Sequence, residues 1–153
     1  SRRRHTRYAD RSRGLGDVYK RQVHRAEFER ELQPLCLDQE IGVIPYSPLA
    51  GGFLTGKYRR DNALPKSNRA GGIRERYMNE RGYTAVDKLE EIGERQGATI
   101  AQTTIAWTLA NPAVTSAIIG ANSLDQLHDT IKGAEFTLNG EEKAALDEIT
   151  AWD

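Results

Sequence analysis

The sequence predicts an α/β fold in which two parallel strands are surrounded by helices. Two short runs, residues 43–46 and 114–119, are rich in valine and isoleucine and have the composition of strands buried in a parallel sheet. Segments with helical periodicity precede, separate and follow these runs. Because the strands alternate with helices, we expect them to be parallel and joined by a right-handed crossover.

The elements of the first half follow from periodicity and turn residues. Helical spacing predicts an amphipathic helix over residues 27–39, although Pro34 lies within it. The strand at 43–46 ends at a Ser-Pro pair, and a glycine-rich loop follows at residues 50–56. Residues 59–79 contain charges, glycines and a proline but no clear period, which predicts a long loop.

Helical periodicity resumes in four segments after this loop, at residues 83–96, 99–109, 123–132 and 140–150. In the first of these segments Val86, Leu89 and Ile92 share one face. Ser123, followed by Gln126 three residues later, is typical of a capping box that opens a helix. The second strand is therefore expected to have helices on both sides of it in sequence.

The composition fits a single domain without a membrane span. A chain of 153 residues with 38% hydrophobic and 29% charged residues has the usual make-up of one water-soluble domain. No apolar run approaches the ~20 residues that a spanning helix requires. Cys36 is the only cysteine and has no cysteine or histidine neighbour at metal-ligand spacing. The sequence therefore predicts no disulfide, no metal site and a cytoplasmic location.

The first 22 residues differ from the rest of the chain. They hold eight Arg or Lys against two Asp and almost no aliphatic side chains, so we expect residues 1–22 to be a disordered basic arm. The chain opens on Ser1, which fits an arm of foreign or artefactual origin. The alternative is a nucleic-acid contact in which arginines neutralise phosphates and Tyr8 and Tyr19 stack on bases, and we regard it as the weaker interpretation.

The glycine-rich loop is a candidate phosphate site. Residues 51–57, GGFLTGK, have the spacing of a P-loop and follow a predicted strand. Tyr58, however, stands where a P-loop has the serine or threonine that holds magnesium, and no helix is predicted directly after it. The sequence argues against a nucleotide triphosphatase but predicts that the glycines and Lys57 bind a phosphate.

A second candidate anion site lies at residues 120–123, where the second predicted strand ends and a capped helix begins. Glycine permits close approach there, and a helix N-terminus presents N–H groups and the positive end of its dipole. An ordinary helix cap is the alternative interpretation. In α/β barrels, phosphates are commonly held by the loops that follow the seventh and eighth strands, and the two candidate sites have this layout.

Two segments resemble aldo-keto reductases. Residues 41–58, IGVIPYSPLAGGFLTGKY, and residues 116–127, SAIIGANSLDQL, are similar in order and spacing to the last two strand-loop segments of that family. The resemblance is nearest to its bacterial and potassium-channel-β-subunit-like branch. It implies that residues 23–153 are the C-terminal, NADP(H)-binding part of a (β/α)8 TIM barrel from an enzyme that reduces aldehydes and ketones.

The resemblance also implies roles for individual residues. Tyr46 matches the aromatic residue that stacks on the nicotinamide ring. The loop over the pyrophosphate is matched by Ser47, Pro48, Leu49, Gly52 and Lys57. Arg69 matches an arginine at the adenosine-phosphate end, and the ribose phosphate and adenine are matched by Gly120, Asn122 and Gln126. The sequence departs from the family at Asp129, where a Glu is usual.

The family's catalytic Asp, Tyr, Lys and His lie on earlier strands of the barrel, and nothing before Val23 matches them. We therefore expect a fragment that retains cofactor-binding segments, has no catalytic residue of its own and is inactive alone. Two strands also leave unpaired edges, which predicts marginal stability. The alternative is a non-catalytic module that binds a dinucleotide or complements a partner carrying the other half of the barrel. The substrate would be a small carbonyl compound.

Overall fold

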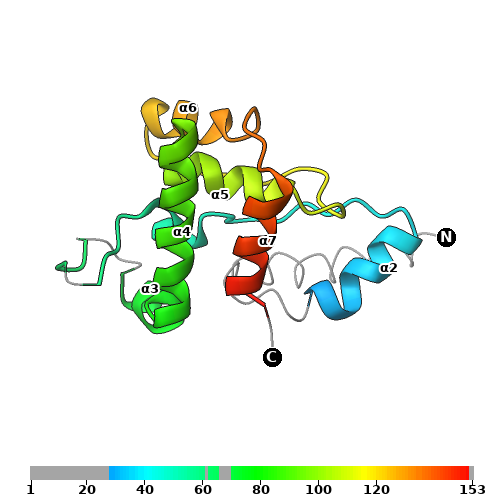
Figure 1. Cartoon of the computed structure of the whole chain (residues 1–153), viewed down its shortest axis with the longest axis horizontal. Helices are drawn as coiled ribbons and strands as arrows, with labels where there is room; N and C mark the ends of the chain where they lie inside the picture. The colour runs from blue at the N-terminus through cyan, green and yellow to red at the C-terminus, as the bar shows by residue number, and fades with distance from the viewer. Residues whose placement is uncertain (1–27, 61, 66–69, 152–153) are drawn as a thin grey trace.

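The computed structural model describes residues 28–60, 62–65 and 70–151, and within them the chain forms mainly helices (Figure 1). In chain order the helical elements are η1 (Phe28–Leu32), α2 (Gln33–Asp38), η2 (Ala50–Thr55), α3 (Ala70–Tyr77), α4 (Glu80–Gln96), α5 (Ile100–Leu109), α6 (Leu124–Lys132) and α7 (Gly140–Ile149). The predicted arm, residues 1–22, lies outside the described residues.

The two segments predicted as strands pair in parallel at two points, but neither forms a regular strand in the described part of the chain. Val43 is bridged to Val114, and Tyr46 is bridged to Ile118. Between these bridges the first segment advances three residues and the second four. The additional residue interrupts the ladder in the manner of a β-bulge. The parallel direction was therefore predicted correctly, whereas the regular strands were not.

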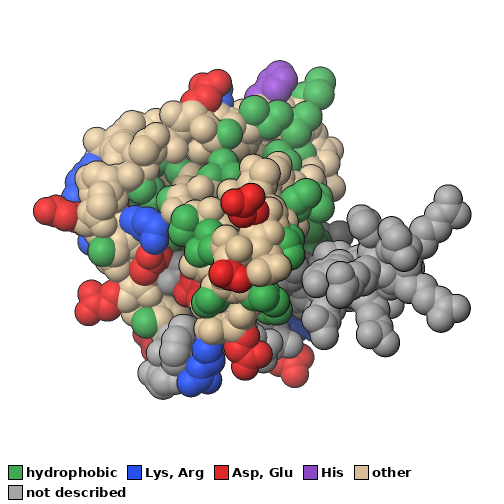
Figure 2. All heavy atoms as spheres, turned by 90° about the vertical axis from the view of Figure 1, so that its right-hand side faces the viewer, with side chains coloured by type: hydrophobic (Ala, Val, Ile, Leu, Met, Phe, Trp, Pro, Cys, Tyr) green, Lys and Arg blue, Asp and Glu red, His purple; other side chains and the backbone are tan. Residues whose placement is uncertain are grey.

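The prediction that both segments are buried is wrong in part. Val43 is 1% exposed, but Ile44 is 55% and Ile118 is 53% exposed. A parallel strand is buried on both faces only when helices and neighbouring strands cover it, and among the described residues each segment is bridged only to the other. Hydrophobic side chains reach the surface on the face drawn in Figure 2, where they lie among charged ones.

The main core lies where α4, α5 and α7 meet. Helix α4 packs against α5 and α7, and α5 also contacts α6 and η2 (Figure 1). On α4 the predicted apolar face is confirmed, since Val86, Leu89 and Ile92 are at most 1% exposed. Phe53 of η2 and Leu146 of α7 are fully buried in the same cluster. The glycine-rich loop thus shares one core with these helices and contacts α5 directly.

The predicted starts of α5, α6 and α7 are confirmed, whereas α4 begins at Glu80, three residues before the predicted start, because the Asn79 side chain caps it by accepting the Gly82 N–H. Thr99 opens α5 and Asn139 opens α7, each through a complete capping box. At α6 the Ser123 hydroxyl accepts the Gln126 N–H at 3.2 Å, as predicted. The reciprocal bond is displaced by one residue, because Gln126 Oε1 accepts the N–H of Asn122 at 3.0 Å and not that of Ser123.

One helix lies inside the predicted long loop. Residues 59–79 were expected to be irregular, but Ala70–Tyr77 forms α3. Ile73 and Tyr77, one turn apart, are buried, and the rings of Tyr77 and Phe53 stack with 5.8 Å between centroids. Packing of this short apolar face outweighs the low helix propensity of the glycine pair at its start.

The first predicted helix is present but changes form along its length. A π-helical turn, η1, leads into α2, which ends at Asp38. Pro34 lies in the first turn of α2, directly after η1, so the residue without an N–H stands at the junction of the two helical forms. Phe28 and Cys36 are buried with Val43 and Ala113 in a second, smaller cluster. This cluster joins the helix to both bridged segments.

Candidate functional site

The bridge between Tyr46 and Ile118 sets the position of the candidate site. The Ile118 N–H donates to the Pro45 carbonyl at 2.8 Å, and the Ser47 N–H donates to the Ile118 carbonyl at 3.2 Å. The glycine-rich loop begins directly after this contact in the first segment, and Gly120 follows it by two residues in the second. Both predicted anion segments therefore leave the paired region at the same end.

Two residues at this end have unusual backbone geometry. Ser47 has a φ of 59° and Ala50 a φ of 50°, in the left-handed region that few residues other than glycine adopt. The Ala50 N–H donates to the Ser47 carbonyl at 3.0 Å, which closes a tight turn around the buried Pro48. Such strain persists only where surrounding contacts enforce it, and it is common at binding sites.

The glycine-rich loop forms kinked turns of 3₁₀ type and not a P-loop, because Gly51, Gly52 and Leu54 depart from helical dihedral angles. Gly51 and Gly52 have φ values of 68° and 96° within η2. The Gly52 N–H donates to the Leu49 carbonyl at 2.8 Å, and the Gly56 N–H donates to the Phe53 carbonyl at 3.2 Å. Both N–H groups therefore donate to carbonyls within the loop and are not free to bind an anion. Binding of an anion at the loop would depend more on Lys57 than the sequence indicated.

Lys57 folds back over Gly52. A Cβ on Gly52 would lie only 2.7 Å from Lys57 Nζ. The same Nζ lies 5.3 Å from the ring centroid of Tyr58, within the range of a cation–π contact. Lys57 is exposed, whereas Tyr58 is 1% exposed. The loop thus presents one positive charge above a glycine with no side chain.

The second anion segment is an exposed helix start. Gly120, Asn122 and Gln126 are all exposed. The N–H of Asn122 is bonded to the Gln126 side chain, and the N–H of Gln126 to the Ser123 hydroxyl, as described above. The N-terminus of this helix directs its dipole toward the segment. Arg69, predicted at the adenosine-phosphate end, lies outside the described residues.

Comparison of the sequence with protein-family models identifies the family. The model of the Aldo/keto reductase family matches residues 18–151. The chain belongs to the aldo-keto reductase family. The resemblance predicted from residues 41–58 and 116–127 is therefore confirmed.

Proteins similar to this chain include an oxidoreductase and a potassium channel subunit. The chain is 35% identical over 121 residues to an uncharacterized oxidoreductase, YrpG, of Bacillus subtilis (strain 168), covering 79% of this chain and 36% of that protein. It is 34% identical over 134 residues to a putative voltage-gated potassium channel subunit beta of Schizosaccharomyces pombe (strain 972 / ATCC 24843), covering 82% and 38%. The chain thus spans little more than a third of the length of these relatives.

A solved structure gives the same family relationship. The glycerol dehydrogenase of Gluconobacter oxydans superposes with a TM-score of 0.67 at 29% sequence identity. The match covers 82% of this chain and 38% of that enzyme. Members of the family are (β/α)8 barrels, whereas the described residues of this chain form helices and two bridged segments without a regular strand.

The aldo-keto reductase chain uses Asp129 in a way that sequence reasoning missed. Its carboxylate accepts hydrogen bonds from Thr99 Oγ1 at 3.0 Å and from Gln102 Nε2 at 2.7 Å. Thr99 and Gln102 are the capping box of α5, so Asp129 joins α6 to the start of α5. No spacing rule could reveal this contact, because the residues are 27 to 30 positions apart.

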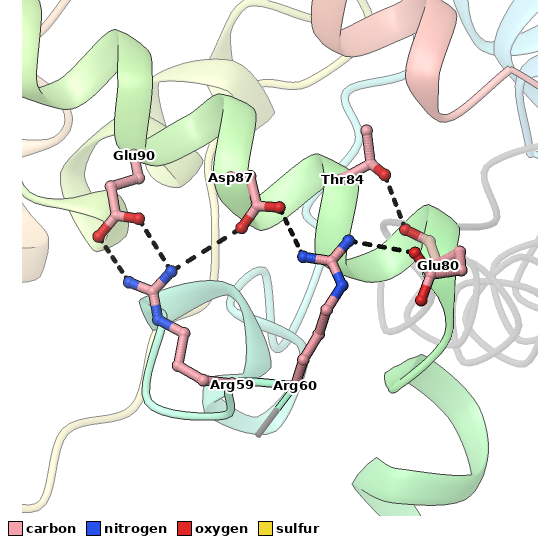
Figure 3. A network of polar contacts seen from close by, with 6 residues as sticks. All are labelled: Arg59, Arg60, Glu80, Thr84, Asp87 and Glu90. Atoms are coloured by element: carbon pink, nitrogen blue, oxygen red, sulfur yellow. Dashed lines mark hydrogen bonds and ion pairs between the residues drawn. The ribbon is translucent and has the colours of Figure 1, made fainter. Parts of the chain in front are cut away.

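The sequence also gave no sign of an ion-pair network behind the glycine-rich loop (Figure 3). Arg59 donates from Nη1 to Glu90 Oε2 at 2.8 Å and from Nη2 to Glu90 Oε1. Arg60 donates to Asp87 Oδ2 at 2.8 Å and to Glu80 Oε2 at 3.2 Å. The hydrogen bonds to Glu90 raise the pKa of the Arg59 guanidinium, and those to Asp87 and Glu80 raise the pKa of Arg60.

No group of three or more His, Cys, Asp or Glu that could hold a metal ion occurs among the described residues. None of the described helices is long and apolar enough to cross a membrane.

Proposed function

We propose that this chain carries the dinucleotide-binding segments of an NADP(H)-dependent oxidoreductase, which converts a carbonyl compound to an alcohol. The observation that carries the proposal is the parallel bridge between Tyr46 and Ile118. It brings the start of the glycine-rich loop and the start of the α6 segment to one end of the paired region. A dinucleotide needs two such phosphate-facing segments beside a flat apolar surface for its ring.

The donors at this end fit a dinucleotide. Lys57 offers a cation above Gly52, and the capped N-terminus of α6 offers a dipole and exposed polar side chains. Tyr46, half-buried, offers an aromatic face next to Ser47. In this proposal Lys57 and the α6 N-terminus bind phosphates, and Tyr46 orients the ring. When bound, a reduced nicotinamide supplies a hydride.

We also propose that the chain does not reduce a carbonyl compound by itself. A developing alkoxide needs a proton donor within hydrogen-bond reach. Tyr58, Tyr77 and Tyr83 are at most 8% exposed and surround Phe53 in the core, so none of these three is placed to reach a substrate. Tyr46 is assigned to the nicotinamide ring in this proposal. The proton donor and the substrate pocket would come from the part of the barrel that the family places before residue 23.

Titration of the 153-residue chain with NADPH, followed by quenching of its tryptophan and tyrosine fluorescence, tests the binding proposal. We expect saturable binding that Lys57→Met weakens about tenfold, since a charge-assisted bond to phosphate is lost. Lys132→Met removes an equal charge from the other end of α6 and should leave the affinity unchanged. Equal affinities of the two variants, or no saturable signal, would contradict the proposal. A parallel titration with NADH measures the preference for the 2′-phosphate.

A second candidate function has an observation of its own. Ile44 and Ile118 lie on the two bridged segments and are more than half exposed, which favours a chain that completes a sheet together with a partner. Mixing it with the remaining part of an oxidoreductase such as YrpG should then restore NADPH-dependent carbonyl reduction. Ile44→Asp should prevent this, while Leu124→Asp, at a 71% exposed position on α6, should not. Absence of activity in every mixture would eliminate this candidate.

A further inference from the structure

Lys57 lies in a segment that is anchored on both sides. On one side the Thr104 hydroxyl of α5 lies 3.0 Å from the Leu54 carbonyl of η2 and 2.8 Å from the Ile100 carbonyl of its own helix, so its single proton is shared between these two acceptors. On the other side Tyr58 is buried in the aromatic cluster, and Arg59 and Arg60 reach α4. Lys57 itself is exposed. Its position over Gly52 is therefore set by its neighbours in sequence.

The arginine contacts form one connected network on a single face of α4 (Figure 3). Glu80, Asp87 and Glu90 are separated by seven and three positions, which places them on the same face of a helix. The two oxygens of Asp87 are divided between the arginines, with Oδ1 at 3.9 Å from Arg59 Nη1 and Oδ2 at 2.8 Å from Arg60 Nη1. Loss of Asp87 would therefore loosen both arginines together.

The planes of the side chains restrict this network further. Arg59 binds Glu90 through two parallel hydrogen bonds, an arrangement that fixes direction as well as distance. Arg60 Cζ lies 4.9 Å from the ring centroid of Tyr83, so its guanidinium rests on an aromatic face of α4 while its ends contact carboxylates. Gly56, with a φ of 77°, turns the chain so that a Cβ there would lie 3.1 Å from Arg59 Nη2.

We propose that Arg59 and Arg60 are positioning residues, which hold Lys57 over Gly52 through Asp87 and Glu90 of α4. Helix α4 would then set the affinity of the glycine-rich loop for a phosphate-bearing dinucleotide, although α4 itself would not contact the dinucleotide. The part of this inference that concerns affinity rests on the proposed function, whereas the part that concerns the position of the loop does not.

The sign of the effect separates this inference from simple electrostatics. Removing a carboxylate near the loop makes the local potential more positive, which by itself strengthens anion binding. Release of Arg59 from α4 lets Lys57 move away from Gly52, which weakens binding. Glu91 provides the matched control, because it neighbours Glu90 on α4 but pairs with Lys88 at 2.8 Å and not with the loop.

Hydrogen–deuterium exchange of the unliganded 153-residue chain tests the position of the loop. Glu90→Gln and Asp87→Asn should speed amide exchange in residues 50–58 by about three- to tenfold, while Glu91→Gln leaves it unchanged. Arg59→Glu should act like Glu90→Gln, and the exchanged pair Arg59→Glu with Glu90→Arg should restore slow exchange. Unchanged exchange in the single variants, at equal thermal stability, overturns the inference.

Titration with NADPH tests the affinity, with inorganic pyrophosphate as a second probe. We expect Glu90→Gln to weaken NADPH binding about threefold and Glu91→Gln to leave it unchanged or slightly stronger. Stronger binding by Glu90→Gln would overturn the role of α4, even if exchange responds. If the unaltered chain binds neither probe, the proposed function fails, and the exchange measurements still decide whether the arginines position the loop.

Discussion

The indole Nε1 of Trp107 on α5 donates a hydrogen bond of 2.9 Å to Asp147 Oδ1 on α7. Trp107 is 3% exposed, so its N–H could not reach bulk water if the carboxylate were removed. Asp147 Oδ2 is also paired with Lys143 one turn earlier on α7. The Asp147 carboxylate thus holds the Trp107 side chain of α5 and fixes the orientation of the Lys143 side chain of α7.

Asp147→Ala should lower the free energy of unfolding by about 2 kcal/mol, because it leaves a buried N–H without this acceptor. Asp147→Asn keeps an oxygen acceptor and should cost about half as much. Glu148→Ala, at the exposed neighbouring position, should change the stability by less than about 0.5 kcal/mol. Urea unfolding followed by tryptophan fluorescence measures all three. Equal effects of the two Asp147 variants would show that charge, and not the acceptor, matters there.

Tyr58→Phe should stabilise the protein. The Tyr58 hydroxyl is buried and has no hydrogen-bond partner among the described residues, while its ring packs against Phe53 with 6.3 Å between centroids. Removing the hydroxyl keeps the ring and relieves an unsatisfied polar group, so we expect a gain of about 1 kcal/mol. Thermal unfolding measures it, and Tyr58→Leu, which loses the ring, should be destabilising. A lower melting temperature for Tyr58→Phe would mean that the hydroxyl is bonded in solution.

Much of the helical structure could be predicted because its signals are local. Thr99, Ser123 and Asn139 each accept the N–H of a residue three positions on, so a cap is visible in four consecutive residues. Helix α3 could not be predicted in this way, because its stability comes from Ile73 and Tyr77 packing against η2. This contact cannot be predicted from a short segment that contains two glycines.

The candidate site also has features that could be predicted from local sequence and features that depend on the fold. Residues of the glycine-rich loop could be selected from spacing, and the structure places Lys57 beside Gly52 as that spacing suggested. Burial of Ile44 and Ile118 was wrongly predicted. A run of β-branched residues indicates strand propensity, but it does not show which strands and helices will cover the segment. The contact of Arg59 with Glu90, 31 residues away, depends on the fold alone.

The same substitution at two glycines should have opposite effects. Gly52→Ala places a Cβ at a φ of 96° and 2.7 Å from Lys57 Nζ, so it should cost at least about 1 kcal/mol and displace the lysine. Gly71→Ala lies in α3 with nothing within 4 Å of the new methyl group and should gain about 0.5–1 kcal/mol from helix propensity. Thermal unfolding of both variants measures the difference. Two changes of the same sign would be inconsistent with this backbone geometry.

Cys36 should make stability depend on pH in the alkaline range. Burial raises the pKa of the Cys36 thiol above its ordinary value of 9.0, whereas the unfolded chain keeps the ordinary value. Folding therefore favours the protonated thiol. Its contribution is fully present below pH 9.0 and is lost as the pH rises through the pKa of the folded state. Urea unfolding should show a steeper alkaline loss of stability for the unaltered chain than for Cys36→Ala.

Alkylation of Cys36 by iodoacetamide near pH 9.0 should also be at least about tenfold slower in the folded protein than in urea. Equal alkylation rates in the two states would show that the thiol is accessible and its pKa unshifted.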